Sequence, residues 1–164
     1  MSPDPSCWPD RRSVDWKVGQ TSAARWCHGA AGIGLVRLEL IKLGASVSWV
    51  RDDLLAALSI VIREDVLTND SLCCGNFGSI LFLNEVGGLE EFHGALGLSS
   101  SRALSRIEAA GMLGGYQWPA GEDVDNVGLY TGLSGVGMGL LHLASPELCG
   151  NPLTMSEPRM HELR

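Results

Sequence analysis

Three segments of the chain share one pattern, in which a G-x-x-G motif leads directly into an apolar run. The segments are 26–38 (WCHGAAGIGLVRL), 72–83 (LCCGNFGSILFL) and 130–143 (YTGLSGVGMGLLHL). Their first glycines, Gly29, Gly75 and Gly132, are separated by 46 and 57 residues. Spacings of this size are typical of a repeated supersecondary unit, so we expect one structural element to occur three times.

The apolar runs predict helices that are buried on several sides. In the segment 33–43 the only polar residues are Arg37, Glu39 and Lys42. Apolar side chains therefore cover most of the circumference of this helix. We expect Gly44 to end it, because glycine accepts the left-handed conformation that often follows a helix.

The segments between these runs have a different periodicity. In 48–62, one helical stripe is formed by Val50, Leu54, Leu58 and Val61. This spacing predicts an amphipathic helix with one solvated face, and Ser48 is the expected cap. The segment 99–111 is a weaker second case, with a serine cluster as the expected cap and Gly111 as the stop.

The order of buried and amphipathic helices predicts an all-α fold. Inner helices wrapped by outer helices form an α/α barrel or toroid, and a solenoid of helical hairpins is the alternative. The motif glycines would open the inner helices, where close approach or positive φ requires a residue without Cβ. The side chains that precede them should gather at one mouth: Cys27 and His28, Cys73 and Cys74, Tyr130 and Thr131.

Length and charge narrow the class of protein. The chain has 164 residues, of which 45% are hydrophobic, and its formal net charge is −7. It is long enough for one domain with a core, and its acidity argues against nucleic-acid or anionic-membrane partners. We find no signal peptide and no apolar run long enough to span a membrane, so we expect a cytoplasmic protein. There, five cysteines favour thiols or metal ligands over disulfides.

The cysteines near the glycines have the donor chemistry of a zinc site. Zinc prefers thiolate and imidazole ligands, and a catalytic zinc keeps one position open. Cys27, Cys73 and Cys74 would supply three thiolates, and His28 could replace one of them. The alternative is that these cysteines are small apolar core residues.

The three motifs together resemble the lanthionine synthetase C-like family, in particular the cyclase domain of class II lanthipeptide synthetases. The resemblance covers roughly residues 20–150 and implies a partial α/α toroid. It implies that one Zn²⁺ is bound by Cys27, Cys73 and Cys74. Most members of the family have His at the position of Cys74, and a subgroup with broad substrate tolerance has C-C-G.

The resemblance also implies a reaction. The family adds a cysteine thiol of a precursor peptide to dehydroalanine or dehydrobutyrine in the same peptide, which forms a thioether ring. A free thiol with a pKa of about 8.5 is mostly protonated at neutral pH, and zinc binding deprotonates it. The α-carbon must then be protonated, and His28 is the candidate general acid.

The resemblance accounts for only the C-terminal part of such a toroid. We expect an irregular segment at 1–19, the toroid portion at 20–150 and a polar tail at 151–164. A separate chain would then supply the remaining repeats and the dehydratase. The alternative function is a non-catalytic helical-repeat fragment that binds a peptide or a partner.

Outside the proposed site, several polar residues are expected to have structural roles. We expect His142 to be a core histidine with satisfied hydrogen bonds, His93 to be solvated, and Asp70 and Asn76 to form turns. No role is assigned to Cys7 or Cys149.

Overall fold

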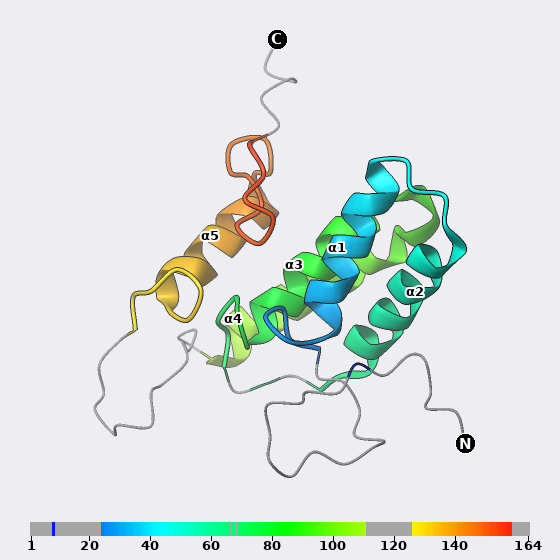
Figure 1. Cartoon of the computed structure of the whole chain (residues 1–164). Helices are drawn as coiled ribbons and strands as arrows, with labels where there is room; N and C mark the ends of the chain where they lie inside the picture. The colour runs from blue at the N-terminus through cyan, green and yellow to red at the C-terminus, as the bar shows by residue number, and fades with distance from the viewer. Residues whose placement is uncertain (1–7, 9–23, 66, 68, 111–125, 159–164) are drawn as a thin grey trace. The chain divides into compact units, whose positions relative to one another are not determined.

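Every regular element of the described chain is helical. The computed structural model describes residues 8, 24–65, 67, 69–110 and 126–158. Across these residues the elements are α1 (Ala30–Lys42), α2 (Ser48–Arg63), α3 (Asn76–Gly87), the short 3₁₀ helix η1 (Glu90–Phe92), α4 (Gly94–Ala110) and α5 (Leu133–Ala144), and no strand is found among them. The all-α prediction is therefore confirmed (Figure 1). The chain forms two compact units that divide after Asp65.

The first unit is a helical hairpin. Helices α1 and α2 pack side by side and run in opposite directions (Figure 1). The predicted stop is confirmed, because Gly44 has a φ of +88° and donates its N–H to the carbonyl of Ile41 at 2.9 Å. The N–H of Ala45 reaches the carbonyl of Leu40 at 2.9 Å, which completes a Schellman motif at the end of α1.

Helix α2 buries the stripe that its sequence predicts. Its buried residues include Val50, Leu54, Leu58 and Val61. The predicted cap is wrong by one residue: Val47 is the N-cap and makes no side-chain cap hydrogen bond, so Ser48 is the first helical residue. Packing of the apolar stripe therefore sets the start of this helix without help from a capping side chain.

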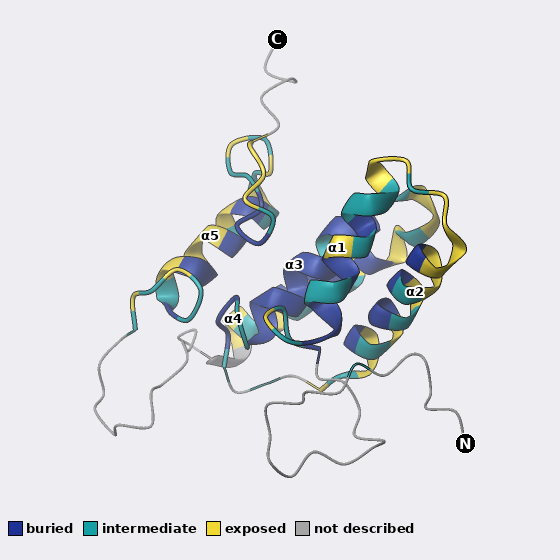
Figure 2. Cartoon of the chain, viewed as in Figure 1, coloured by how far each residue is buried: buried dark blue, intermediate teal, exposed yellow. Residues whose placement is uncertain are grey.

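The second unit is built around α3. This helix is buried around its whole circumference (Figure 2), with Phe77, Leu81 and Phe82 fully inaccessible. Helix α5 packs against α3, and the absence of a side chain at Gly139 leaves space for the ring of Phe77. Of the three predicted inner helices, α3 thus matches the expected burial. Helix α1 exposes 54% of Val36, and α5 exposes 58% of Leu141.

Helix α4 begins five residues earlier than its sequence predicts. A Cβ at Gly87 would lie 2.5 Å from the Cγ atom of Leu96, so this glycine lets the first turn of α4 approach the end of α3. The serine cluster consequently lies inside the helix and does not cap it. Ser99 is fully buried and donates its hydroxyl to the carbonyl of Ile80 at 2.8 Å. Gly111 lies outside the described residues.

The motif glycines are explained by close approach. A Cβ at Gly32 would collide with the carbonyl oxygen of Trp26, and one at Gly135 with that of Leu129. The carbonyl lies six residues before the glycine in both motifs. The N-cap glycines at 29, 75 and 132 have extended φ values of −154°, −116° and −130°, so positive φ is not the reason for them. The expectation of crowded backbones is confirmed.

Candidate metal centre

The first motif places a thiol beside an imidazole. Cys27 and His28 lie in the turn directly before α1, whose N-cap is Gly29. The Sγ atom of Cys27 is 2.7 Å from Nδ1 of His28. Cys27 is exposed and His28 is half-buried, so both donor atoms belong to a turn that a ligand can reach.

The second motif places two thiols side by side. Cys73 and Cys74 precede Gly75, the N-cap of α3, and both are half-buried. Their Sγ atoms are 3.4 Å apart. Two sulfur ligands of a tetrahedral zinc, each at about 2.3 Å from the ion, lie about 3.8 Å apart. The pair is therefore close to the spacing that a shared metal ion requires.

The amide of Asn76 fixes the backbone around the cysteine pair. Its Oδ1 accepts the N–H of Leu67 at 2.8 Å. Its Nδ2 donates to the carbonyls of Leu67 and Asn69 at 2.8 and 3.0 Å, and to Oδ1 of Asp70 at 2.7 Å. Asn76 is thus the side chain that closes the turn on which Cys73 and Cys74 lie, and its expected role in forming a turn is confirmed.

A buried ion pair supports the same turn from α4. Arg106 donates from Nε to Oδ1 of Asp70 at 2.6 Å and from Nη2 to Oδ2 at 2.8 Å. Asp70 is fully inaccessible, and the side chain of Arg106 is 15% exposed. The hydrogen bonds to Asp70 raise the pKa of Arg106 above its usual value, so the guanidinium stays charged. This arrangement holds α4 to the turn that precedes α3.

The third motif repeats the hydrogen-bond pattern of the second. Asn69 and Asn126 each accept an N–H two residues later, on Ser71 at 2.8 Å and on Gly128 at 2.9 Å. The carbonyl of each also accepts the N–H seven residues later, at 3.0 and 2.8 Å. The carbonyl of Tyr130 accepts the N–H of Cys73 at 2.8 Å, so the third turn directly contacts the second.

Three of these supporting groups were missed by sequence reasoning. Asn69 and Asn126 both lie six residues before the first glycine of their motif, and this spacing was a detectable signal. Arg106 gave no such signal, because it lies in the weakest amphipathic segment, 36 residues from its partner Asp70. Long-range ion pairs of this kind leave no periodic trace in a sequence.

The other histidines lie away from the motif cysteines in sequence, and the expected exposure of His93 and burial of His142 are confirmed. His93 is exposed in a turn, and His161 and Cys7 lie outside the described residues. His142 on α5 is 5% exposed. Its Nδ1 donates to the carbonyl of Cys149 at 2.8 Å, because a carbonyl oxygen can only accept.

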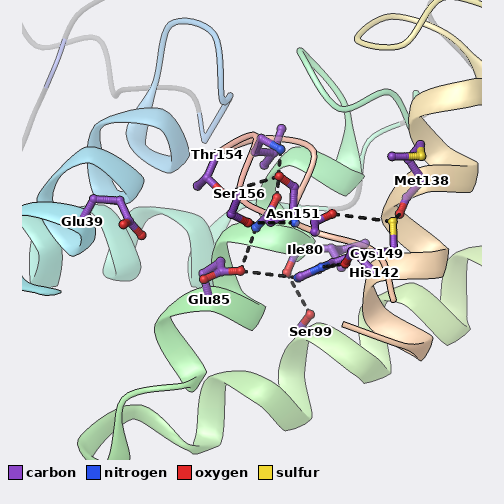
Figure 3. A network of polar contacts seen from close by, with 12 residues as sticks. Glu39, Ile80, Glu85, Ser99, Met138, His142, Cys149, Asn151, Thr154 and Ser156 are labelled. Atoms are coloured by element: carbon purple, nitrogen blue, oxygen red, sulfur yellow. Dashed lines mark hydrogen bonds and ion pairs between the residues drawn. The ribbon is translucent and has the colours of Figure 1, made fainter. Parts of the chain in front are cut away.

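His142 belongs to a buried polar network in the second unit. Figure 3 shows His142, Glu85 and Asn151 pointing toward one another. Glu85 Oε1 accepts from Nδ2 of Asn151 at 2.9 Å and lies 3.4 Å from Nε2 of His142. Asn151 and Leu153, which fall in the segment expected as a polar tail, are buried at 1% and 6% exposure. The network therefore anchors the chain after α5 onto α3.

The residues with ligand chemistry remain thiols. Cys27, Cys73, Cys74 and Cys149 form no disulfides. Cys27, Cys73 and Cys74 each offer one sulfur atom that could ligate a metal ion. The Sγ atom of Cys149 lies 3.6 Å from the carbonyl oxygen of Gly150 and 3.8 Å from that of Met138.

Two turns that carry cysteines therefore precede helices α1 and α3. Comparison with known proteins identifies the family to which such a chain belongs. Residues 2–153 match the family described as lanthionine synthetase C-like protein, and the chain belongs to this family. A lacticin 481/lactococcin biosynthesis protein, LcnDR2 of Lactococcus lactis subsp. lactis, is 28% identical over 146 residues. The match covers 82% of this chain and 15% of the length of LcnDR2. No solved structure matches the chain. None of the helices described here is long and apolar enough to cross a membrane.

Proposed function

We propose that the chain is part of a zinc-dependent lanthionine cyclase. The proposed reaction joins a cysteine thiol of a precursor peptide to a dehydroalanine or dehydrobutyrine residue of the same peptide. The observation that carries the proposal is the pair of sulfur atoms of Cys73 and Cys74, 3.4 Å apart at the start of α3 in a member of the lanthionine synthetase C-like family.

Cys27, Cys73 and Cys74 are the proposed ligands of one Zn²⁺. Three thiolates suit the preference of zinc for sulfur, and a set of three protein ligands leaves the fourth position for substrate. When bound, the ion would lower the pKa of an approaching thiol, so that the peptide cysteine reacts as a thiolate at neutral pH. Asn76, Asp70 and Arg106 would hold two of the ligands in place through the turn before α3.

His28 is the proposed general acid. In the addition, the sulfur forms a bond to the β-carbon and the alkene electrons move onto the α-carbon and its carbonyl group. The proton lost by the thiol must be replaced by one delivered to the α-carbon, and an imidazole beside Cys27 has a suitable pKa range. The product contains the same atoms as the reactant, so no further co-reactant is needed.

The chain would act as one part of an α/α toroid. It spans about 15% of the length of LcnDR2, whose name assigns it to lacticin 481/lactococcin biosynthesis. We propose that a separate chain or region supplies the remaining repeats and a dehydratase, and that the substrate is a dehydrated precursor peptide.

The proposal is tested by ring formation. The zinc-loaded chain, with the rest of the toroid supplied separately, is mixed with a peptide that contains one cysteine and one dehydroalanine. Because cyclisation leaves the mass unchanged, its progress is followed as loss of N-ethylmaleimide labelling of the peptide. We expect a rate above that without protein, lost in the Cys73→Ala/Cys74→Ala double variant. Equal rates with the native chain and the double variant would contradict the proposal.

A further inference from the structure

A cavity on the first unit leads away from the Cys27–His28 turn along α1. Its volume is about 490 Å³. Trp26, Cys27 and His28 lie at one end, and Ile33, Val36 and Arg37 line the remainder. All of these residues belong to the first unit, so the cavity is a feature of α1 and the turn before it.

The wall of this cavity is apolar and accessible. Val36 is 54% exposed, although it lies on a helix whose other apolar residues are mostly buried. Gly32 also lines the cavity, between its two ends. A larger residue is excluded there, because a Cβ would collide with the carbonyl of Trp26.

The positive charge of Arg37 at the far end of the cavity is already paired with a carboxylate. Arg37 donates from Nε to Oδ2 of Asp53 at 2.8 Å, and its guanidinium carbon lies 5.0 Å from the centre of the Trp49 ring. An acidic ligand would have to compete with Asp53 for this guanidinium. The cavity is therefore better suited to a neutral apolar group than to a carboxylate.

We propose that this cavity binds an apolar side chain next to the reacting cysteine of the peptide, so that Ile33 and Val36 determine substrate preference. This inference rests on the proposed function and names the substrate class for the same site. The cavity is continuous with the proposed site, because Cys27 and His28 line it. A peptide whose thiol reaches Cys27 therefore places its neighbouring residues along α1.

The length of the cavity along α1 limits the preference for apolar side chains to the residues next to the peptide cysteine. From Ala30 to Arg37, α1 rises by roughly 10 Å. An extended peptide covers this distance with about three residues. Partial burial of one leucine side chain against Ile33 and Val36 should improve affinity by about tenfold over a polar residue of similar size.

Two short peptides test the inference on the full zinc-loaded chain. Each contains a single cysteine, flanked on both sides by leucine in one peptide and by asparagine in the other. Dissociation constants are measured by titration calorimetry for the native chain, for Val36→Asn and for Val47→Asn. Val47 is the matched control, because it is 51% exposed in the same unit and does not line the cavity.

We expect the leucine peptide to bind the native chain and Val47→Asn about tenfold more tightly, and the preference to disappear in Val36→Asn. Equal binding of both peptides by the native chain, with zinc and thiol binding intact, would overturn this inference and leave the proposed function standing. A chain that binds neither zinc nor peptide would overturn both. If Val36→Asn instead converts a dimer into a monomer in light scattering, a second copy covers the cavity and the inference is wrong.

Discussion

Arg106 donates two hydrogen bonds to the carboxylate of Asp70, and this pair joins helix α4 to the turn that carries Cys73 and Cys74. Asp70 is fully inaccessible to solvent. It also accepts a hydrogen bond from Asn76 at 2.7 Å, so one buried carboxylate connects α4, the turn and the first residue of α3. The cysteine pair is therefore held by tertiary contacts as well as by its own short segment.

Removal of the arginine should destabilise the second unit strongly. The variant Arg106→Met leaves the carboxylate of Asp70 buried with no opposite charge, which typically costs about 3–5 kcal/mol. The control is Asp53→Asn, which breaks the pair with Arg37, whose side chains are 23% and 24% exposed, and it should cost about 1 kcal/mol or less. Urea unfolding followed by circular dichroism measures both changes. Equal losses in the two variants would show that burial of Asp70 does not matter.

The same arginine should influence metal binding without contacting the ion. With the turn no longer held by α4, we expect the zinc affinity of Arg106→Met to fall by about 10- to 100-fold, as for other groups that orient ligands. Arg106→Lys, which keeps the charge, should recover part of the affinity. Competition with a zinc chelator at a temperature where both variants remain folded measures the effect. Unchanged affinity in folded Arg106→Met would exclude a positioning role.

Substitution by alanine at two glycines of α5 should change the stability of the chain in opposite directions. Gly137 has nothing within 4 Å of an added Cβ, so Gly137→Ala should stabilise the chain by about 0.5–1 kcal/mol. Gly135→Ala should destabilise it by more than that, because its Cβ would collide with the carbonyl of Leu129. Thermal unfolding of the two variants makes the comparison, and a stabilising effect of Gly135→Ala would disprove the close approach at this motif.

The identity of the residue at position 74 should affect the reaction rate. Replacement of one proposed thiolate ligand by imidazole, as in Cys74→His, would lower the negative charge that the protein places beside the substrate sulfur. A less negative environment should make that sulfur a weaker nucleophile and slow cyclisation. The rate is measured in the labelling assay with the remaining toroid supplied. A rate equal to or above that of the native chain would refute this explanation.

The sequence predicted the helices better than their ends. Val50, Leu54, Leu58 and Val61 recur at helical spacing, and all four are buried as expected. The starts of α2 and α4 were placed at serines, because capping propensity is a local signal. In the folded chain, packing of Leu96 against Gly87 sets the start of α4, and this contact joins residues that no local pattern connects.

Of the candidate site, the sequence predicted only the donor atoms. Cys27, Cys73 and Cys74 stand out because they precede motif glycines, and the paired sulfurs of Cys73 and Cys74 lie at a spacing suitable for a metal. The ion pair between Asp70 and Arg106 was not predicted, since it depends on how α4 packs. The cavity beside Val36 was not predicted either, because the apolar run suggested burial on several sides.

Zinc content is the measurement that tests the central claim most directly. The full chain is purified and its zinc per protein is determined by elemental analysis, beside the Cys73→Ala/Cys74→Ala variant and a Cys149→Ala control. We predict about one zinc per chain, retained in the control and lost in the double variant. A folded native chain without zinc, or a double variant that keeps it, would contradict the proposed metal centre.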